Sequence, residues 1–205
     1  MRIAFWLVPL LAVVGCHLCS PDVKTPLPSP ARTATPVPSA PVQSGSIPVS
    51  PANSSISFTG STAITSHAGH FDSFEGTLEA PTEDPKDLKI RVAVNMDSTS
   101  TKIGLLTKHL KNEDFFDVPR YPNSEFVLDG ISPSAEAGRY TVTGKLTLHG
   151  VQRPLSFPAR IAITPEEVSF EGTMTIRQSE FGMLEAARKT KDDVPVTVSI
   201  RCRRR

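Results

Sequence analysis

The residues with the clearest chemical potential are a few histidines and acids. His109 lies five positions before Asp114, and a histidine with a carboxylate could serve as an acid–base pair. His67 and His70 have the spacing HxxH, which could supply two metal ligands, but no third ligand follows nearby. The sequence contains no GxSxG, no HExxH and no glycine-rich phosphate loop. These patterns favour a protein without catalytic activity and without a bound metal or cofactor.

The N-terminal stretch MRIAFWLVPLLAVVGC has the pattern of an export signal. Arg2 precedes an apolar run over residues 3–14, which is too short to span a bilayer and is interrupted by Pro9. The letters VVGC, which end at Cys16, resemble the bacterial lipobox, whose cysteine is acylated before cleavage. We therefore expect residues 1–15 to be a lipoprotein signal peptide and Cys16 to be the membrane anchor. The alternative is an ordinary cleaved signal.

Residues 16–45 are rich in proline, serine and threonine. Closely spaced prolines remove backbone donors and favour extended polyproline II structure, so we expect a disordered linker between the membrane and a folded domain. The expected location is the periplasm or cell envelope of a bacterium, with inner or outer membrane left open. Cys19 either forms a disulfide with Cys202 or stays free while Cys202 is buried as a small apolar residue.

Residues 46–203 alternate between apolar and polar side chains over most of their length. In LKIRVAVNM, for example, Leu88, Ile90 and Val92 share one face of a strand. Eight such segments predict an all-β fold, an antiparallel eight-stranded barrel, because closure covers the apolar face and removes the edges. The inward register includes three glycines, which either leave the wall bare or mark bends in the strands: Gly60, Gly144 and Gly172.

One long interruption separates two of the predicted strands. Residues 98–101 offer N-cap side chains, and Ile103, Leu106 and Leu110 follow at helical spacing, which predicts one short helix. Phe115 and Phe116 come next, between acidic residues, and two such rings are costly to leave in water. We expect at least one ring to point inward, as part of an aromatic loop over the mouth of the barrel.

Several motifs in this order resemble the YceI-like family of polyisoprenoid-binding, lipocalin-like proteins. They are SFTG at 57–60, HLK at 109–111, DFFDV at 114–118, YP at 121–122, GKLTLHGV at 144–151 and SEFG at 179–182. The segment after Gly182 is shorter than in many relatives. The resemblance implies an extended lipocalin-like barrel whose lumen holds a polyisoprenoid or a similar, quinone-like lipid.

The strand register assigns a set of inward residues to this lumen, although a filled core is the alternative for each of them. The lumen candidates are Phe58, Val92, Val94, Val142, Leu146, Phe157, Phe170 and Met174, with Leu110, Phe115, Phe116 and Phe181 nearer the mouth. At the head or rim of the ligand we place His109, Asp114 and Arg177. Arg177 and Asp114 could instead pair with each other and hold the loop.

Three functions remain open from the sequence. The first is a lipid-anchored protein that binds a lipid for carriage, storage or sensing. The second is a structural or stress-related surface module with a packed barrel, and the third is an enzyme that uses His109 and Asp114 on an isoprenoid. A formal net charge of +1 provides no field to gather nucleic acid, so no such partner is expected. Whether two barrels pair is left open.

Overall fold

The computed structural model describes residues 45–204, which form one antiparallel sheet with a few short helices. Its strands are β1 (Ser46–Val49), β2 (Ser54–Ser61), β3 (Ser66–Phe71), β4 (Phe74–Glu79), β5 (Lys89–Asn95), β6 (Thr99–Thr101), β7 (Asn123–Pro133), β8 (Arg139–Leu148), β9 (Val151–Ile163), β10 (Glu167–Arg177) and β11 (Asp193–Arg203). The helices are α1 (Gly104–Leu110) and α2 (Leu184–Lys189), with 3₁₀ turns η1 (Pro85–Asp87), η2 (Met96–Ser98) and η3 (Gln178–Phe181). Cys16, Cys19 and the predicted signal and linker lie outside the described residues, apart from the end of the linker.

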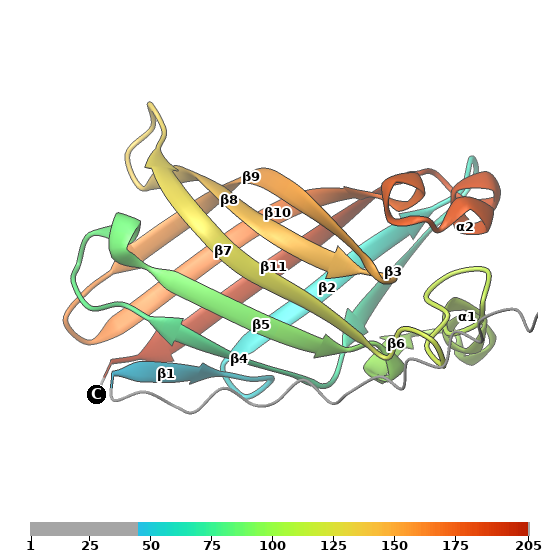
Figure 1. Cartoon of the computed structure of the whole chain (residues 1–205), viewed down its shortest axis with the longest axis horizontal. Helices are drawn as coiled ribbons and strands as arrows, with labels where there is room; N and C mark the ends of the chain where they lie inside the picture. Colours follow the sequence, from blue (N-terminus) through green and yellow to red (C-terminus); the bar gives the residue numbers. More distant parts are fainter. Residues whose placement is uncertain (1–44, 205) are drawn as a thin grey trace, which may run out of the picture. The chain divides into compact units, whose positions relative to one another are not determined.

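The sheet curls round a single apolar core (Figure 1). Its strand order is β1-β4-β5-β7-β8-β9-β10-β11-β2-β3-β6. The chain runs from β3 directly into β4 and from β5 through η2 into β6. Because β4 pairs with β5 while β3 pairs with β6, these bent segments bring the sheet round towards closure.

The all-β prediction is confirmed, but the sheet has eleven strands where eight were expected. The eight predicted segments correspond to β2, β4, β5 and β7 to β11. The additional strands β1, β3 and β6 are short, and their sequences SIPV, SHAGHF and TST lack a clear apolar alternation. Tertiary pairing with neighbouring strands therefore decides that they are extended.

The predicted strand register agrees with the observed burial. In β8, Val142, Gly144 and Leu146 are buried, whereas the intervening Thr143 and Lys145 are exposed. A two-residue turn joins β8 to β9, and both of its residues, His149 and Gly150, have positive φ (52° and 74°). This geometry matches the tight turns that suit the twist of antiparallel hairpins.

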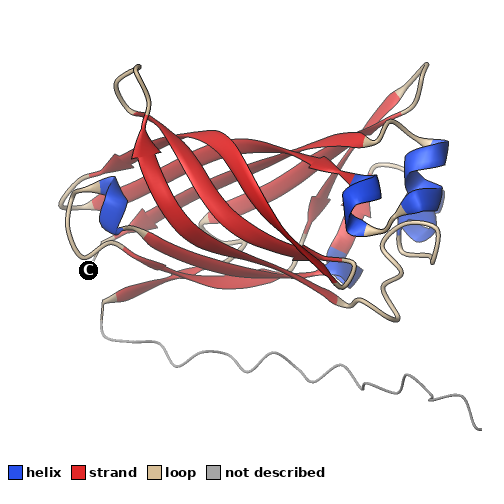
Figure 2. Cartoon of the chain, turned by 45° about the horizontal axis from the view of Figure 1, so that its top comes forward, coloured by secondary structure: helices blue, strands red, loops and turns tan. Residues whose placement is uncertain are grey.

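The two ends of the barrel differ, as Figures 1 and 2 show. The helical end comprises α1, α2, η3 and the β2–β3 turn at residues 62–65. The closed end comprises η1 and the turns at residues 134–138 and 164–166, next to the end of β11. No helix of the described residues is long and apolar enough to cross a bilayer.

The predicted helix is present as α1, but its start was wrongly assigned. Ile103, rather than a residue between 98 and 101, occupies the N-cap, and it makes no side-chain capping bond. Thr101 belongs to β6, and its hydroxyl lies 2.9 Å from that of Thr107 in α1. The polar residues before α1 therefore tie the helix to the sheet edge and do not cap it.

Cys202 lies at the closed end and is buried near the end of β11. Its Sγ lies 3.4 Å from the Asn53 amide nitrogen, and burial raises the pKa of its thiol. Cys202 is thus inside the core, as one of the two sequence interpretations expected. Cys19 lies outside the described residues, so the predicted disulfide stays a prediction.

Candidate ligand-binding cavity

A cavity of about 210 Å³ lies inside the curled sheet and extends towards the helical end. Apolar side chains from the strands and from α1 form most of its wall. Among the described residues, the lining contains no Lys, Arg, Asp or Glu, and its polar side chains include those of His67 and Gln178. An apolar enclosure of this kind suits a hydrocarbon chain and disfavours a charged group.

Ten of the predicted lumen residues line this cavity. They are Phe58, Val92, Val94, Leu110, Phe115, Phe116, Leu146, Phe157, Phe170 and Met174. Val142 and Phe181 do not, although both side chains are fully buried. Val142 pairs with Ile131 and Phe157 towards the closed end, where the interior is filled. Phe181 belongs to η3, and in the same turn the backbone carbonyl of Glu180 accepts a hydrogen bond from Arg153 of β9.

The inward glycines divide into two kinds. A Cβ atom on Gly144 would lie 2.5 Å from the ring of Phe126, and one on Gly172 would lie 2.9 Å from the ring of Phe157. Each of these glycines therefore makes room for an aromatic ring. Gly60 differs, because a Cβ atom there would have no neighbour within 4 Å. At Gly60, no side chain projects from the wall, and the space in front of it is part of the cavity.

An aromatic cluster covers the cavity at the helical end. The ring of Phe116 lies 6.1 Å from that of Phe58, edge to face, and 6.2 Å from that of Phe71. Phe115 is buried beside it and contacts the ring of His109, at 4.9 Å. The backbone N–H of Phe116 donates to the carbonyl of Leu110, which holds the loop against the end of α1. Both rings thus point towards the cavity.

The three residues predicted at the head or rim of the ligand do not line the cavity. His109 is exposed apart from its contact with Phe115. Asp114 accepts a hydrogen bond from Lys189 of α2 at 2.6 Å, which holds the pKa of its carboxyl below the usual range. This pairing contradicts both an acid–base pair of Asp114 with His109 and an ion pair of Asp114 with Arg177.

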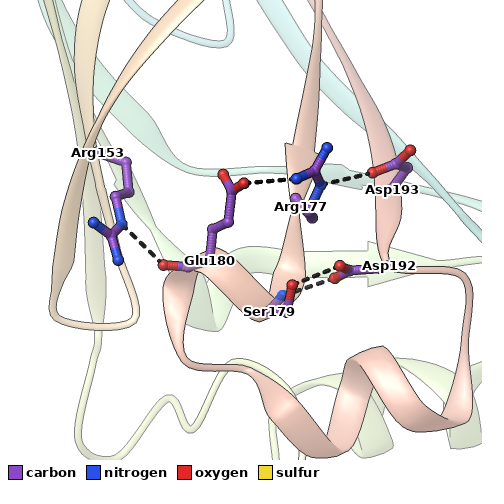
Figure 3. A network of polar contacts seen from close by, with 6 residues as sticks. All are labelled: Arg153, Arg177, Ser179, Glu180, Asp192 and Asp193. Atoms are coloured by element: carbon purple, nitrogen blue, oxygen red, sulfur yellow. Dashed lines mark hydrogen bonds and ion pairs between the residues drawn. The ribbon is translucent and has the colours of Figure 1, made fainter.

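Arg177 belongs instead to a surface network that holds η3 (Figure 3). Its guanidinium pairs with Glu180 at 2.9 Å and Asp193 at 3.5 Å. Within the same turn, the backbone N–H and the hydroxyl of Ser179 both donate to the carboxylate of Asp192. These contacts tie the end of β10 to the start of β11, and they position the residue between Arg177 and Ser179.

That residue, Gln178, is a polar cavity residue that was not predicted. Its side chain is 7% exposed, and its amide nitrogen donates to the Thr190 hydroxyl (2.9 Å) and to the Lys191 carbonyl (2.8 Å). Its side-chain carbonyl oxygen, Oε1, accepts no hydrogen bond within the described part of the chain, whereas its backbone carbonyl accepts one from the Met183 N–H. Gln178 continues the inward register of Met174 and Ile176, and this was the signal in the sequence that could have identified it.

The two histidines of the HxxH motif point to opposite faces of β3. His67 is the cross-strand partner of Gly60 and lines the cavity, whereas the imidazole of His70 lies 3.1 Å from the exposed carboxylate of Asp72. Residues three apart in a strand face opposite sides, so these two cannot bind one metal ion together. His67 is instead a polar group of the cavity wall.

The sequence of this chain matches a known family and several relatives. The family model of the YceI-like domain matches residues 48–202. A UPF0312 protein of Pseudomonas aeruginosa is 25% identical over 138 residues, which are 64% of this chain and 71% of that protein. A UPF0312 protein of Pseudomonas savastanoi is 31% identical over 121 residues, which are 56% and 62% of the two chains.

Solved structures share the fold. BcnA from Burkholderia cenocepacia superimposes with a TM-score of 0.65 at 23% identity, over 74% of this chain and 97% of that one. A polyisoprenoid binding domain from Saccharophagus degradans, implicated in plant cell wall breakdown, has a TM-score of 0.64 at 13% identity, over 78% and 99% of the two chains. With the family model matched across almost the whole curled sheet, this chain belongs to the YceI-like domain family.

Proposed function

We propose that this protein binds a polyisoprenoid or a similar amphiphilic lipid in the cavity, for carriage, storage or sensing. The observation that carries the proposal is the composition of the wall, which is predominantly apolar and, over the described residues, contains no Lys, Arg, Asp or Glu. The similarity of the fold to a polyisoprenoid binding domain supports it. A binding role of this kind needs no catalytic residues.

The binding energy would come mainly from burial of apolar surface. A chain that buries on the order of 300 Å² gains about 7 kcal/mol at about 25 cal/mol per Å², before the cost of ordering it is subtracted. The cavity volume of about 210 Å³ is below that of most small-molecule pockets. A long chain would therefore have to displace side chains of the wall, and the half-buried Phe116 at the mouth is the first candidate.

The head of the ligand inside the cavity should be uncharged. A buried charge without a partner is costly. Over the described residues, the wall contains no Lys, Arg, Asp or Glu that could pair with a charged head group. Gln178 presents a carbonyl oxygen, which needs a hydrogen-bond donor, and His67 lies on the neighbouring wall. We infer that a hydroxyl group fits this end, whereas a phosphate or diphosphate would stay outside the mouth.

The test is to identify and count what the full chain carries. We would extract the purified protein with organic solvent, before and after offering a long-chain prenol, and analyse the extract by mass spectrometry. The Gly60→Leu variant extends a side chain into the open part of the cavity, and Thr59→Leu, one residue away on the other face, is its matched control. We expect about one lipid per chain in the wild type and in Thr59→Leu, and a loss of at least fivefold in Gly60→Leu. An empty wild type after the prenol is offered would contradict lipid binding and favour a structural module.

We also propose that Cys16 anchors the protein to a bacterial membrane. The support is the lipobox-like sequence VVGC, and Cys16 lies outside the described residues. A lipid-modified terminus with several acyl chains would hold the protein stably at a membrane. In the Cys16→Ser variant, most of the protein should leave the membrane fraction after centrifugation. Equal membrane attachment of the variant and the wild type would exclude this anchor.

A further inference from the structure

The described residues include four large apolar side chains that are exposed to solvent. They are Ile64 (96%), Ile103 (46%), Leu105 (83%) and Leu184 (57%). Single exposed apolar residues are common on proteins and need no explanation. These four are unusual in their location, because every one of them belongs to the helical end (Figure 1).

Each exposed side chain is a near neighbour, along the chain, of a residue that lines the cavity. Ile64 lies two residues after the cavity residue Thr62 in the β2–β3 turn, and Ile103 lies two residues after the cavity residue Thr101. Leu105 precedes Leu106 on α1, and Leu184 follows Met183 at the start of α2. Three separate segments of the chain thus present an apolar group around the mouth of the cavity. We call these four residues the apolar rim.

Several lysines lie beside the apolar rim, and three of them have no acidic partner among the described residues. Lys102, Lys108 and Lys191 have no carboxylate within 4.0 Å in the part of the chain that the structure describes. The acids close by are mostly engaged: Asp97 by Lys111, Asp114 by Lys189 and Glu185 by Arg188. Glu113 and Asp192 are the exceptions: neither pairs with a basic side chain among the described residues, and Asp192 accepts hydrogen bonds from Ser179. Exposed aliphatic groups next to free lysines are typical of surfaces that bind anionic membranes.

The closed end has a different surface. Its turns contain Glu83, Asp84, Glu136 and Glu166, and no large exposed apolar side chain occurs there among the described residues. The arginines at the end of β11 add positive charge, but Arg204 is held by the carbonyls of Thr164 and Ala80. The combination of exposed apolar groups, free lysines and a cavity mouth therefore occurs at the helical end.

We propose that the helical end docks on the surface of a lipid bilayer that contains anionic headgroups, with the apolar rim inserted among the lipids. This position would let a lipid pass between the bilayer and the cavity without crossing water. The inference rests on the proposed lipid-binding function for its purpose, but the docking surface is separate from the Cys16 anchor. A second copy of the chain is the competing occupant, and the experiment distinguishes the two.

Site-specific photo-cross-linking tests the docking directly. A photoreactive amino acid replaces Leu105 or Ile64 in the full chain, and Ala135 at the exposed β7–β8 turn is the matched control position. The proteins are mixed with vesicles of phosphatidylcholine alone or with one fifth phosphatidylglycerol. We expect at least fivefold more phospholipid adducts at positions 64 and 105 than at 135, and more with phosphatidylglycerol. Equal labelling at the three positions, or cross-links to a second copy instead of lipid, would overturn the proposal.

A second measurement separates docking from ligand binding. Leu105→Glu changes the apolar rim without changing a cavity residue, and Ser134→Glu is the control at the closed end. We expect Leu105→Glu to slow the uptake of a fluorescent prenol from phosphatidylglycerol-containing vesicles at least fivefold. Its final occupancy should be unchanged when the prenol is added from ethanol. Equal uptake rates would overturn docking as the route of transfer, whereas adducts at the rim without prenol binding would overturn the proposed function alone.

Discussion

The closed end and the helical end use the same strands for different purposes. Strand β10 begins at the closed end with the fully buried Val168, and it reaches the cavity through Phe170, Met174 and Ile176. The inward alternation is unbroken along this strand, so it does not distinguish the two ends. What differs is whether side chains from the opposite wall fill the space in front of it. A barrel can therefore combine a rigid packed core and a ligand cavity within one sheet.

The difference also extends to the surface. The closed end has short turns with acidic residues, whereas the helical end has the aromatic loop, two helices and the apolar rim. The helices α1 and α2 contribute no strand pairs to the sheet. We therefore expect the closed end to set the stability of the protein and the helical end to set its binding. Three predictions test this division.

The largest effect is expected for truncation of a leucine at the closed end. Leu78 is fully buried in β4 away from the cavity, so Leu78→Ala should lower the free energy of unfolding by about 3 kcal/mol. Leu146→Ala is the matched variant, because Leu146 borders the cavity and already lacks packing partners on one side. Its cost should be about half as large. Urea unfolding measures both, and equal costs would contradict the distinction between filled and open regions.

An intermediate effect is expected for the two kinds of inward glycine. Gly144→Ala places a methyl group 2.5 Å from the Phe126 ring and 2.7 Å from the Val127 carbonyl, so the backbone must shift. We expect it to cost about 1–3 kcal/mol of stability. Gly60→Ala should be nearly neutral or slightly stabilising, because its methyl group meets open space and alanine suits extended backbone better. Thermal unfolding of the pair provides the test, and a larger loss in Gly60→Ala would show that the wall there is filled.

The smallest effect is expected from the pH dependence of the helical end. The pKa of His149 is lowered mainly by burial, and its buried Nε2 has no hydrogen-bond partner in the described residues. The unfolded chain therefore takes up a proton more readily, so stability should fall as the pH drops below the ordinary histidine pKa of about 6.5. Solvent screening of this half-buried group keeps the effect below about 1 kcal/mol.

Replacement of His149 by asparagine tests this pH dependence. Asparagine tolerates the positive φ of the β8–β9 turn, so His149→Asn should preserve the hairpin. The difference between the urea midpoints at pH 7.5 and pH 5.5 should be smaller in the variant than in the wild type. An unchanged difference would mean that other groups cause the acid sensitivity.

Several features of the fold and the cavity could be predicted because they depend on local patterns. The strands β5 and β8 to β11, their inward faces and the short helix follow from side-chain periodicity, which the backbone geometry imposes residue by residue. The aromatic loop was predicted because two adjacent phenylalanines are too costly to leave in water. Ten of the predicted lumen residues line the cavity, because the inward register of a strand continues until the strand breaks; their contact with a ligand stays a prediction.

The errors concern partners that are distant in the sequence. Asp114 pairs with Lys189, which is 75 residues away, and no local signal selects that lysine over Arg177 or His109. Gln178 was missed because β10 ends at the outward Arg177 and Gln178 is the first residue of the 3₁₀ turn η3. The alternation of the strand was not extended beyond Arg177. Strand β3 pairs with β2 and β6, and neither β3 nor β6 has an apolar pattern of its own.

The sequence by itself thus determined which residues face inward, where the chain turns and that an aromatic loop must be covered. These properties follow from the fixed geometry of the backbone and the cost of exposing apolar side chains. The tertiary structure decided which inward positions meet a filled core and which meet a cavity. That outcome depends on the distance between opposite walls of the barrel and on whether a ring such as Phe126 or Phe157 occupies the space left by a glycine. Only the arrangement of all the strands together sets this distance.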